Sequence, residues 1–93
     1  MQSAVRENRD RNRFELEVSG DVAFASYHLS DGELAIFHTE VPVGLRGRGI
    51  GSRLVKGVLD EARRRNLKVV PRCSFVRTFI DQNPYYEDLV SDG

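Results

Sequence analysis

Residues 41–65, VPVGLRGRGIGSRLVKGVLDEARRR, decide the fold, because a turn rich in glycine and arginine runs directly into a segment with a helical period. From position 50 onward, apolar residues recur every three or four positions and predict one buried face of a helix. These residues are Ile50, Leu54, Val55, Val58, Leu59 and Ala62. On the solvent-exposed face of this helix, Asp60/Arg64 and Glu61/Arg65 are expected to form ion pairs one turn apart. Asn66 is typical of the left-handed residue that ends a helix, so we expect a helix over residues 50–65.

Three segments before this stretch alternate apolar and polar residues, as half-buried strands do. They span residues 13–18, about 22–29 and about 33–41. The third is expected to carry four side chains on one face: Leu34, Ile36, His38 and Glu40. Asp31-Gly32 favours a two-residue hairpin turn, so the second and third strands are expected to pair antiparallel.

Two further elements are expected after the long helix. Residues 67–70 predict a short strand parallel to the third strand, because a strand, a long helix and a strand normally make a parallel crossover. Ser74 is expected to cap a second helix that ends at Gln82, before Asn83-Pro84. Its inward residues are expected to be Phe75, Val76, Phe79 and Ile80.

The composition fits a single globular domain, since 40% of the 93 residues are hydrophobic and 30% are charged. Residues 1–12 are polar and predict a flexible N-terminus, which leaves residues 13–93 as the domain. No apolar run has the length of a membrane span or the character of a signal peptide, so we expect a cytoplasmic protein. The single cysteine, Cys73, has no second cysteine or histidine at metal-ligand spacing, and no metal site is expected.

Charge is distributed unevenly along a chain whose formal net charge is zero. Ten of the 14 lysines and arginines lie between positions 46 and 77, against two of the 14 acidic residues. A local excess of this kind indicates an anionic ligand with a small footprint. A nucleic-acid module is a weaker alternative, because aromatic residues are not interleaved with the basic cluster. We expect neither a nucleic-acid partner nor a membrane partner.

The glycine turn has the character of an anion site, because free N–H groups at a helix start converge on a ligand and the helix dipole favours negative charge. Two familiar glycine motifs are excluded by spacing. A dinucleotide fingerprint would need glycine where Ser52 stands, and a P-loop would need a lysine earlier than Lys56. A helix start with incidental glycines is the alternative, although four glycines in eight residues exceed what a helix entry needs.

Residues 46–51, RGRGIG, instead match the pattern Gln/Arg-x-x-Gly-x-Gly/Ala. Together with HTEVPVGLRGRGIGSRLV, LKVVPRCSFV and PYYEDLV, in that order, the chain resembles the GNAT acyltransferase superfamily, and more closely its small stand-alone class. The resemblance covers residues 13–90. It implies a minimal α+β fold (α/β in some schemes), in which antiparallel strands lead into a pyrophosphate-binding turn, a long helix, a strand and a short helix.

The resemblance also implies acetyl-coenzyme A as the ligand. The residues that it assigns to coenzyme binding are Val41, Val43, Arg46, Gly47, Arg48, Gly49, Ile50, Gly51 and Ser52. The two valines would offer backbone contacts to the pantetheine arm, and the remaining residues form the phosphate turn.

Three residues are candidates for the chemistry. The superfamily's usual tyrosine acid falls on Ile80, whereas Cys73 stands where the small class has a cysteine proposed as catalytic. A helix start near Arg72 and Arg77 is expected to lower the pKa of this thiol, which could accept the acetyl group, protonate the leaving thiolate, or simply fill a buried junction. Glu40 and His38 share a strand face and could relay a proton, although a solvated strand would look the same.

The implied function is an acetyl-coenzyme A-dependent N-acetyltransferase. The helices that shape the acceptor pocket in larger relatives are absent, so the acceptor site is expected to be open to an amine of a protein, a peptide or a small molecule. A non-catalytic module that binds coenzyme A or acyl-coenzyme A is the alternative, which the missing tyrosine favours. The sequence identifies neither the acceptor nor the oligomeric state.

Overall fold

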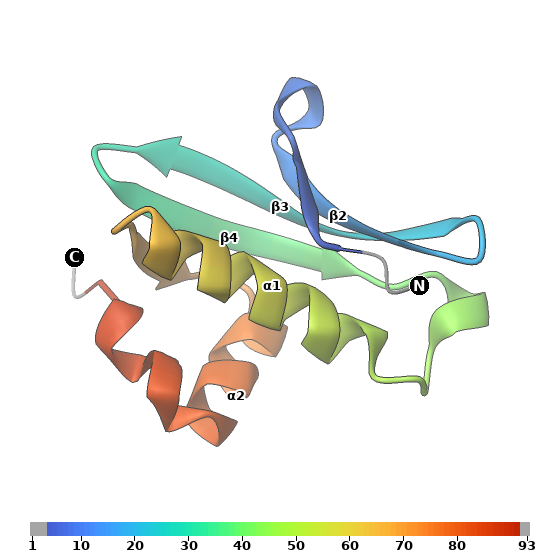
Figure 1. Ribbon diagram of the computed structural model, residues 1–93. Helices are drawn as coiled ribbons and strands as arrows, with labels where there is room; N and C mark the ends of the chain where they lie inside the picture. Colours follow the sequence, from blue (N-terminus) through green and yellow to red (C-terminus); the bar gives the residue numbers. More distant parts are fainter. Residues whose placement is uncertain (1–3, 92–93) are drawn as a thin grey trace.

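A computed structural model describes residues 4–91 of the protein (Figure 1). The four predicted strands and one further strand form a single five-stranded sheet in the order β1-β2-β3-β4-β5. The strands are β1 (Arg6–Asn8), β2 (Arg13–Val18), β3 (Asp21–Ser30), β4 (Glu33–Glu40) and β5 (Lys68–Pro71). The helices are α1 (Ile50–Arg64) and α2 (Ser74–Gln82), with 3-10 turns at Arg9–Arg11, Val43–Leu45 and Pro84–Leu89. Neighbouring strands are antiparallel up to β4, and β5 runs parallel to β4, as predicted. The α+β class is therefore confirmed.

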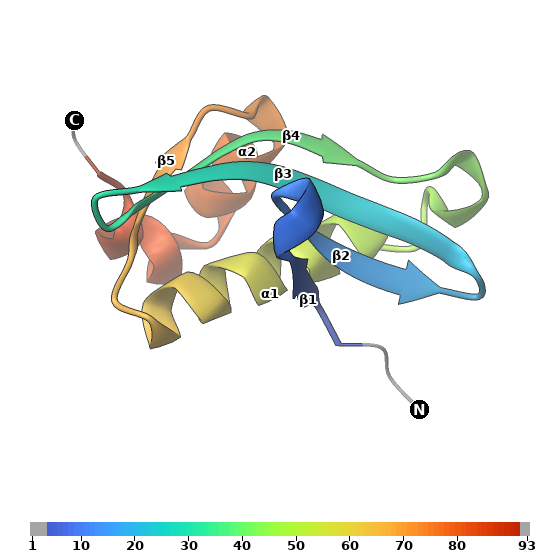
Figure 2. The ribbon, with the colours of Figure 1, turned by 90° about the horizontal axis from the view of Figure 1, so that it is seen from above.

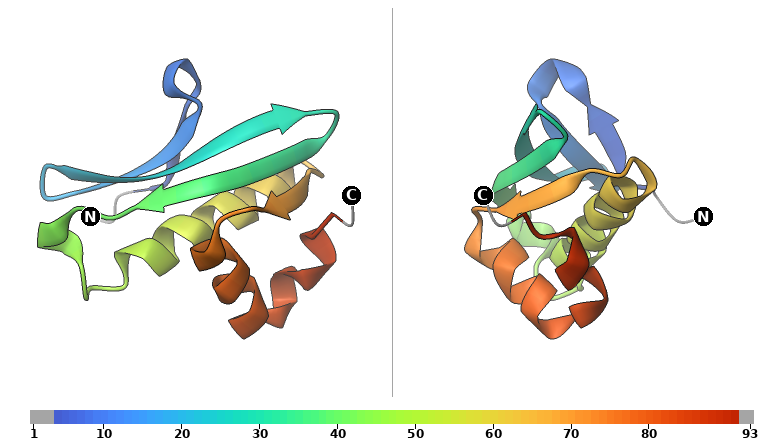
Figure 3. Two further views of the ribbon diagram at one scale, coloured as in Figure 1. Left: turned by 180° about the vertical axis from the view of Figure 1, so that it is seen from behind. Right: turned by 90° about the vertical axis from the view of Figure 1, so that its left-hand side faces the viewer.

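Both helices lie on the same side of the sheet (Figures 1 and 3). The six apolar residues predicted for one face of α1 are all buried. They pack against the buried residues of the strands, which include Phe14, Leu16, Ala23, Ala25, Leu34 and Ile36. The other face of the sheet carries no helix in the described part of the chain, so the core lies entirely between the sheet and the helices.

Local turn chemistry fixes the ends of the main elements. Asp31 and Gly32 both have positive φ values, 52° and 78°, and join β3 to β4 in the predicted hairpin. Asn66 has a φ of 59°, and the N–H of Leu67 donates to the carbonyl of Ala62 at 2.9 Å. This is the 6→1 bond of a Schellman motif, so the predicted left-handed end of α1 is confirmed.

A bulge in β4 changes the face of the sheet on which the later residues of this strand lie, and this corrects the prediction. Adjacent residues Ser26 and Tyr27 of β3 pair with His38 and Ile36, so Phe37 has no partner on β3. The extra residue reverses the alternation beyond it. Ile36 faces the helices, as Leu34 does, whereas His38 and Glu40 lie on the open face, and Thr39 takes the helix-facing side. The prediction that all four residues share a face was wrong, although His38 and Glu40 do share one.

The N-terminal segment contains a strand that was not predicted, because β1 is only three residues long. It pairs with β2 and lies close to α1 (Figure 2). Val5 packs against Gly57 in α1, where a Cβ would stand 2.4 Å from a Val5 methyl carbon. The flexibility of residues 1–12 stays a prediction, and residues 1–3, like 92 and 93 of the predicted domain, lie outside the described part.

Glu7 of β1 ties this segment to the sheet and to the helix. Its carboxylate accepts hydrogen bonds from the Tyr27 hydroxyl and from Arg65 at 2.7 Å, and its side chain is only 11% exposed. Burial raises the pKa of Glu7, but the hydrogen bonds from Arg65 and Tyr27 outweigh it and hold the pKa below its ordinary value. Burial and the same carboxylate raise the pKa of Tyr27 to about 12.

The C-terminal region departs from the prediction at two residues. Cys73, not Ser74, is the N-cap of α2, and its backbone is extended, with a φ of −100° and a ψ of 129°. Phe75 is 42% exposed instead of inward, while Val76 and Ile80 are fully buried as predicted. None of the helices within residues 4–91 has the length and apolar character needed to cross a membrane.

Candidate functional site

The glycine turn leaves the start of α1 without a side-chain cap. Gly47 and Gly49 have φ values of 80° and 70°, a region that residues with a side chain adopt much less readily than glycine. Gly49 is the N-cap, and since glycine has no side chain, none bonds to the first helical N–H groups. A Cβ at either glycine would meet nothing within 4 Å. The backbone N–H groups of the first turn are therefore open to a ligand that approaches closely.

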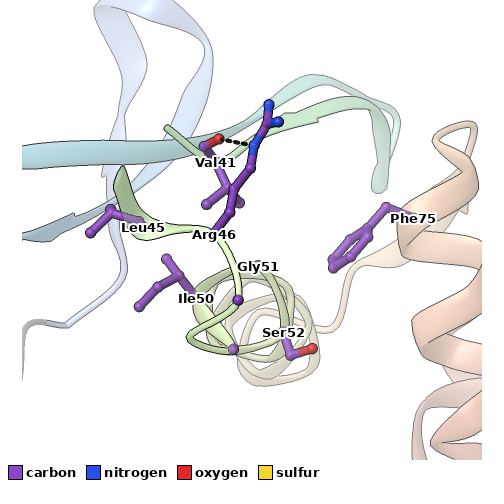
Figure 4. A pocket seen from close by; sticks show the side chains of 9 residues that line it. Val41, Leu45, Arg46, Ile50, Gly51, Ser52 and Phe75 are labelled. Carbon is purple, nitrogen blue, oxygen red and sulfur yellow. Dashed lines mark hydrogen bonds between the residues drawn. The ribbon is translucent and has the colours of Figure 1, made fainter. Parts of the chain in front are cut away.

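A pocket of about 330 Å³ lies over this helix start (Figure 4). Its lining residues are Val41, Leu45, Arg46, Gly47, Gly49, Ile50, Gly51, Ser52 and Phe75. Arg46 is anchored there, because its Nε donates to the carbonyl of Val41 at 3.2 Å. Of the residues predicted for coenzyme binding, only Val43 and Arg48 are not part of this lining; Val43 lies in the 3-10 turn after Pro42 and is 78% exposed.

Phe75 forms the wall of the pocket opposite Arg46 (Figure 4). Its ring lies so close to α1 that a Cβ on Gly51 would stand 2.8 Å from Cζ. Gly51 therefore allows the ring to rest against the helix start. The sequence prediction missed this wall, and the signal that could have found it is a glycine inside the first turn of a helix.

The basic residues divide into two groups. Those at the end of α1 are paired: Arg63 with Asp88 at 2.8 Å, Arg64 with Glu61, and Arg65 with Glu7 and Glu61, both at 2.7 Å. The expected Asp60/Arg64 pair is absent from the described chain, because Asp60 accepts hydrogen bonds from Lys56 and from the buried Tyr86 hydroxyl.

The second group surrounds the turn. Within residues 4–91 no ion pair joins Arg46, Arg48 or Arg53 to a carboxylate, and all three are exposed. Lys68 and Arg72 of the basic segment also have no ion pair within these residues, so three of its five unneutralised charges lie around the turn, where the helix start is already electropositive.

Cys73 lies against Thr39 of β4, with Sγ and Oγ1 3.5 Å apart. Burial raises the pKa of the Cys73 thiol, but hydrogen bonding from Thr39 and from the backbone N–H groups of Val76 and Phe75 outweighs it and lowers the pKa below its ordinary value. The predicted direction is therefore correct, and so is the part of the predicted cause that lies in the helix start, because Phe75 and Val76 belong to the first turn of α2. The predicted contribution of Arg72 and Arg77 is absent from the causes of the shift.

The Thr39–Cys73 pair lies beside the pocket. Thr39 is two residues before Val41 and Cys73 is two residues before Phe75, and both Val41 and Phe75 line the pocket. The last bond between the strands runs from the Arg72 N–H to the Ile36 carbonyl at 2.9 Å. Beyond it β4 continues to Glu40, whereas β5 has ended at Pro71.

His38 and Glu40 are not brought together with Cys73. They contact each other, with His38 Nε2 3.2 Å from Glu40 Oε1, and about half of each side chain is exposed. The His38 ring also lies near Phe24, with ring centroids 5.9 Å apart. These side chains project from the face of β4 opposite Thr39, so the three predicted catalytic residues occupy two sides of one strand.

Comparisons with known proteins agree on one family. Residues 13–89 match the family described as GCN5-related N-acetyl-transferase. Protein NATD1 of Gallus gallus is 33% identical over 91 residues, which cover 91% of this chain and 83% of that protein. Protein NATD1 of Homo sapiens is 32% identical over 83 residues, covering 86% and 74%. A GCN5-like protein of Staphylococcus aureus, solved by NMR, superposes with a TM-score of 0.68 at 26% identity, covering 97% of this chain and 89% of that one.

Proposed function

The chain belongs to the GCN5-related N-acetyltransferase family, and from this premise we propose that it transfers an acetyl group from acetyl-coenzyme A to an amine. The observation that carries the proposal is the uncapped start of α1 beneath a pocket that Arg46 lines, with Arg48 and Arg53 exposed on the same turn and helix start. A pyrophosphate needs converging N–H donors, close approach to the backbone and positive charge, and the glycine turn offers all three.

The residues of the pocket take distinct parts in binding. The N–H groups at Gly47, Gly49, Ile50, Gly51 and Ser52 face the phosphates. Arg46 adds charge from a position fixed by the Val41 carbonyl, and the exposed Arg48 adds longer-range attraction. Val41 and Phe75 line the path of the pantetheine arm toward Thr39 and Cys73. Because Val43 lies outside the pocket, we assign the backbone contact on this strand to Val41 alone.

Acetyl transfer forms a bond from the amine nitrogen to the acetyl carbon and breaks the bond from that carbon to sulfur. The amine proton must leave, and the departing thiolate must gain a proton. The Cys73 thiol is suited to the second task, because a lowered pKa makes it a better proton donor than an ordinary thiol. Its thiolate is equally suited to accept the acetyl group first and pass it to the amine. The His38–Glu40 pair, on the open face, is suited to receive the amine proton.

Titration calorimetry with acetyl-coenzyme A tests the binding step, and an enthalpy of binding that saturates at micromolar to millimolar ligand is expected. No binding at millimolar ligand would refute the proposal. Mass spectrometry of the wild type and of Cys73→Ala, after incubation with acetyl-coenzyme A and a panel of amines, tests the chemistry. An acetyl group on Cys73 supports the covalent route, and acetylated amine without acetyl-cysteine supports the acid route.

A coenzyme A-binding module without catalysis is the second candidate. One observation favours it: position 80, where the family's usual tyrosine acid would stand, is a fully buried isoleucine in the core. Binding without acetylation of Cys73 or of any amine in the panel would select this candidate over the enzyme.

A further inference from the structure

Strand β3 extends beyond the start of its neighbour β2, so part of one edge of β3 has no β2 residue beside it. β2 begins at Arg13, which lies opposite Ser26, whereas β3 runs on past the N-terminal loop (blue) toward the hairpin turn with β4 (Figure 1). At the junction, the Tyr27 N–H donates to the carbonyl of Asn12 at 3.0 Å. The Asn12 N–H turns away and donates to the carbonyl of Arg9 at 3.2 Å. The N-terminal chain therefore leaves β3 at Asn12.

The edge that continues beyond this junction presents the backbone of Leu29. In an antiparallel pair, the residues that exchange hydrogen bonds alternate with residues whose N–H and C=O groups point to the other side. Tyr27 directs its N–H toward the β2 side, and Leu29, two residues later, directs its backbone groups the same way. Within residues 4–91, the backbone of Leu29 makes no hydrogen bond to a segment on that side. One N–H donor and one C=O acceptor are therefore available there.

A cavity of about 430 Å³ lies along this edge. Its lining residues are Glu7, Arg9, Asn12, Tyr27, His28 and Leu29, and none of them lines the pocket over the start of α1. Side chains from both faces of β3 contribute, because successive strand residues alternate between the faces. The cavity therefore follows the edge of the strand and not one face of the sheet, and the Leu29 side chain is 43% exposed beside it.

The cavity has one guanidinium that is only loosely held. The Glu7 carboxylate is already engaged, because it accepts hydrogen bonds from the Tyr27 hydroxyl and from Arg65 at 2.7 Å. Arg9 is 79% exposed, and a 3.4 Å contact joins its Nε to the same carboxylate. The Asn12 side chain makes no hydrogen bond within the described chain. A guanidinium and an unbonded amide beside an open strand edge are suited to the carboxylate that ends an extended peptide.

We propose that this edge binds the C-terminus of a partner protein as an added strand, antiparallel to β3 and in line with β2. The penultimate residue lies opposite Leu29 and exchanges both backbone hydrogen bonds with it, and the last residue lies opposite His28. The added strand must end there, because Asn12 holds the next position, opposite Tyr27. Its terminal carboxylate therefore meets Asn12 and Arg9. A strand of the opposite direction would bring an amino terminus to Arg9, where like charges repel.

The same geometry sets a preference at the penultimate residue. Side chains directly opposite each other in paired strands share a face, so this side chain contacts that of Leu29 and is expected to be apolar. Two backbone hydrogen bonds, one charged contact and one apolar contact make a weak interaction, with half-saturation at about 1 mM. The inference does not depend on coenzyme binding, so it and the proposed function can fail separately.

Peptide titrations of the full chain, followed by ¹H–¹⁵N NMR spectra, test this edge. The first probe is N-acetyl-Ala-Ala-Leu-Ala with a free carboxylate. Three related probes carry a C-terminal amide, an N-methyl group on the leucine nitrogen, or aspartate in place of the leucine. The proteins are the wild type, Arg9→Gln and the control Arg11→Gln. Arg11 is a matched control because it is exposed in the same 3-10 turn and does not line the cavity.

The free acid is expected to shift the amide signals of residues 27–29 and to reach half-saturation at about 1 mM. The amide, the N-methyl peptide and the aspartate peptide should each bind wild type at least about tenfold more weakly. In Arg9→Gln the acid and the amide should bind within about twofold of each other, whereas Arg11→Gln should behave like wild type. The spectrum of each variant shows whether it is folded, and the comparison of peptides on wild type needs neither variant.

Three results would overturn the proposal. Unshifted signals of residues 27–29 at about 10 mM free acid would mean that no strand is added at this edge. Equal binding of the acid and the amide by wild type would mean that the carboxylate is not recognised. Tighter binding of a peptide that has a free amino terminus and a C-terminal amide would mean that the strand runs in the other direction.

Discussion

Replacing Gly57 by alanine is expected to destabilise the protein, although the same change in an ordinary helix interior is stabilising. Alanine in place of glycine gains about 1 kcal/mol of helix propensity. Here the new Cβ would stand 2.4 Å and 2.7 Å from Val5 Cγ2 and Cβ, closer than real atoms approach. Overpacking of this kind costs about 1–3 kcal/mol. The net expectation for Gly57→Ala is a loss of about 1 kcal/mol in the free energy of unfolding.

The sign is expected to reverse when Val5 is removed. Val5→Gly alone should cost about 1 kcal/mol, because a half-buried valine side chain is lost. In that background Gly57→Ala meets neither carbon and should stabilise the protein by about 1 kcal/mol. The coupling free energy between the two sites is therefore about 2 kcal/mol. Val5→Ala keeps the Cβ at 2.7 Å and should give a smaller coupling.

Equilibrium urea unfolding of the wild type, both single variants and the double variant measures this coupling from the extrapolated free energies. Additivity within about 0.5 kcal/mol would contradict the packing of Val5 on α1. The N-terminal segment would then be independent of the helix whose start forms the pocket.

Two further predictions concern titrating groups. Thr39→Val should move the midpoint of the pH profile of Cys73 alkylation by iodoacetamide to higher pH, because a hydrogen bond that lowers the thiol pKa is lost. The control variant Thr78→Val should leave the midpoint in place. An unmoved midpoint in Thr39→Val would exclude the contact. Glu7→Gln should cost about 1–2 kcal/mol at pH 7, unlike the exposed Glu17→Gln. Because the folded pKa of Glu7 is lowered, its contribution to the free energy of unfolding is complete above about pH 5 and is lost as pH falls through the folded pKa. The urea unfolding curves of the wild type and Glu7→Gln should therefore converge in acid. A difference that stays constant with pH would contradict this.

The parts of the fold that the sequence predicted correctly depend on local rules. The helical stripe of α1 needs only a period of 3.6 residues, and the Asp31-Gly32 turn needs only two residues that tolerate positive φ. The glycine turn belongs with them, because spacing alone excluded the commoner glycine motifs. Most of the residues predicted from it line one pocket.

The features that sequence reasoning missed depend on contacts between distant segments. The bulge at Phe37 follows from how β3 and β4 align, and it moves His38 and Glu40 off the face that Leu34 and Ile36 occupy. The Thr39–Cys73 contact joins residues 34 positions apart. Phe75 is apolar and was expected inward, but its ring turns toward the space left at Gly51. Glycines inside α1 were the available signal, since each marks a close approach by another segment.

The central claim is that phosphates of coenzyme A bind at the uncapped start of α1, and a matched pair of glycine variants tests it most directly. Gly49 and Gly20 both have positive φ, 70° and 85°, and a Cβ at either meets nothing within 4 Å. Alanine at each should therefore cost a similar amount of stability, about 1 kcal/mol. In calorimetric titration with acetyl-coenzyme A, Gly49→Ala is expected to bind at least about tenfold more weakly than wild type, and Gly20→Ala to bind like wild type. Equal affinity in both variants would contradict the claim.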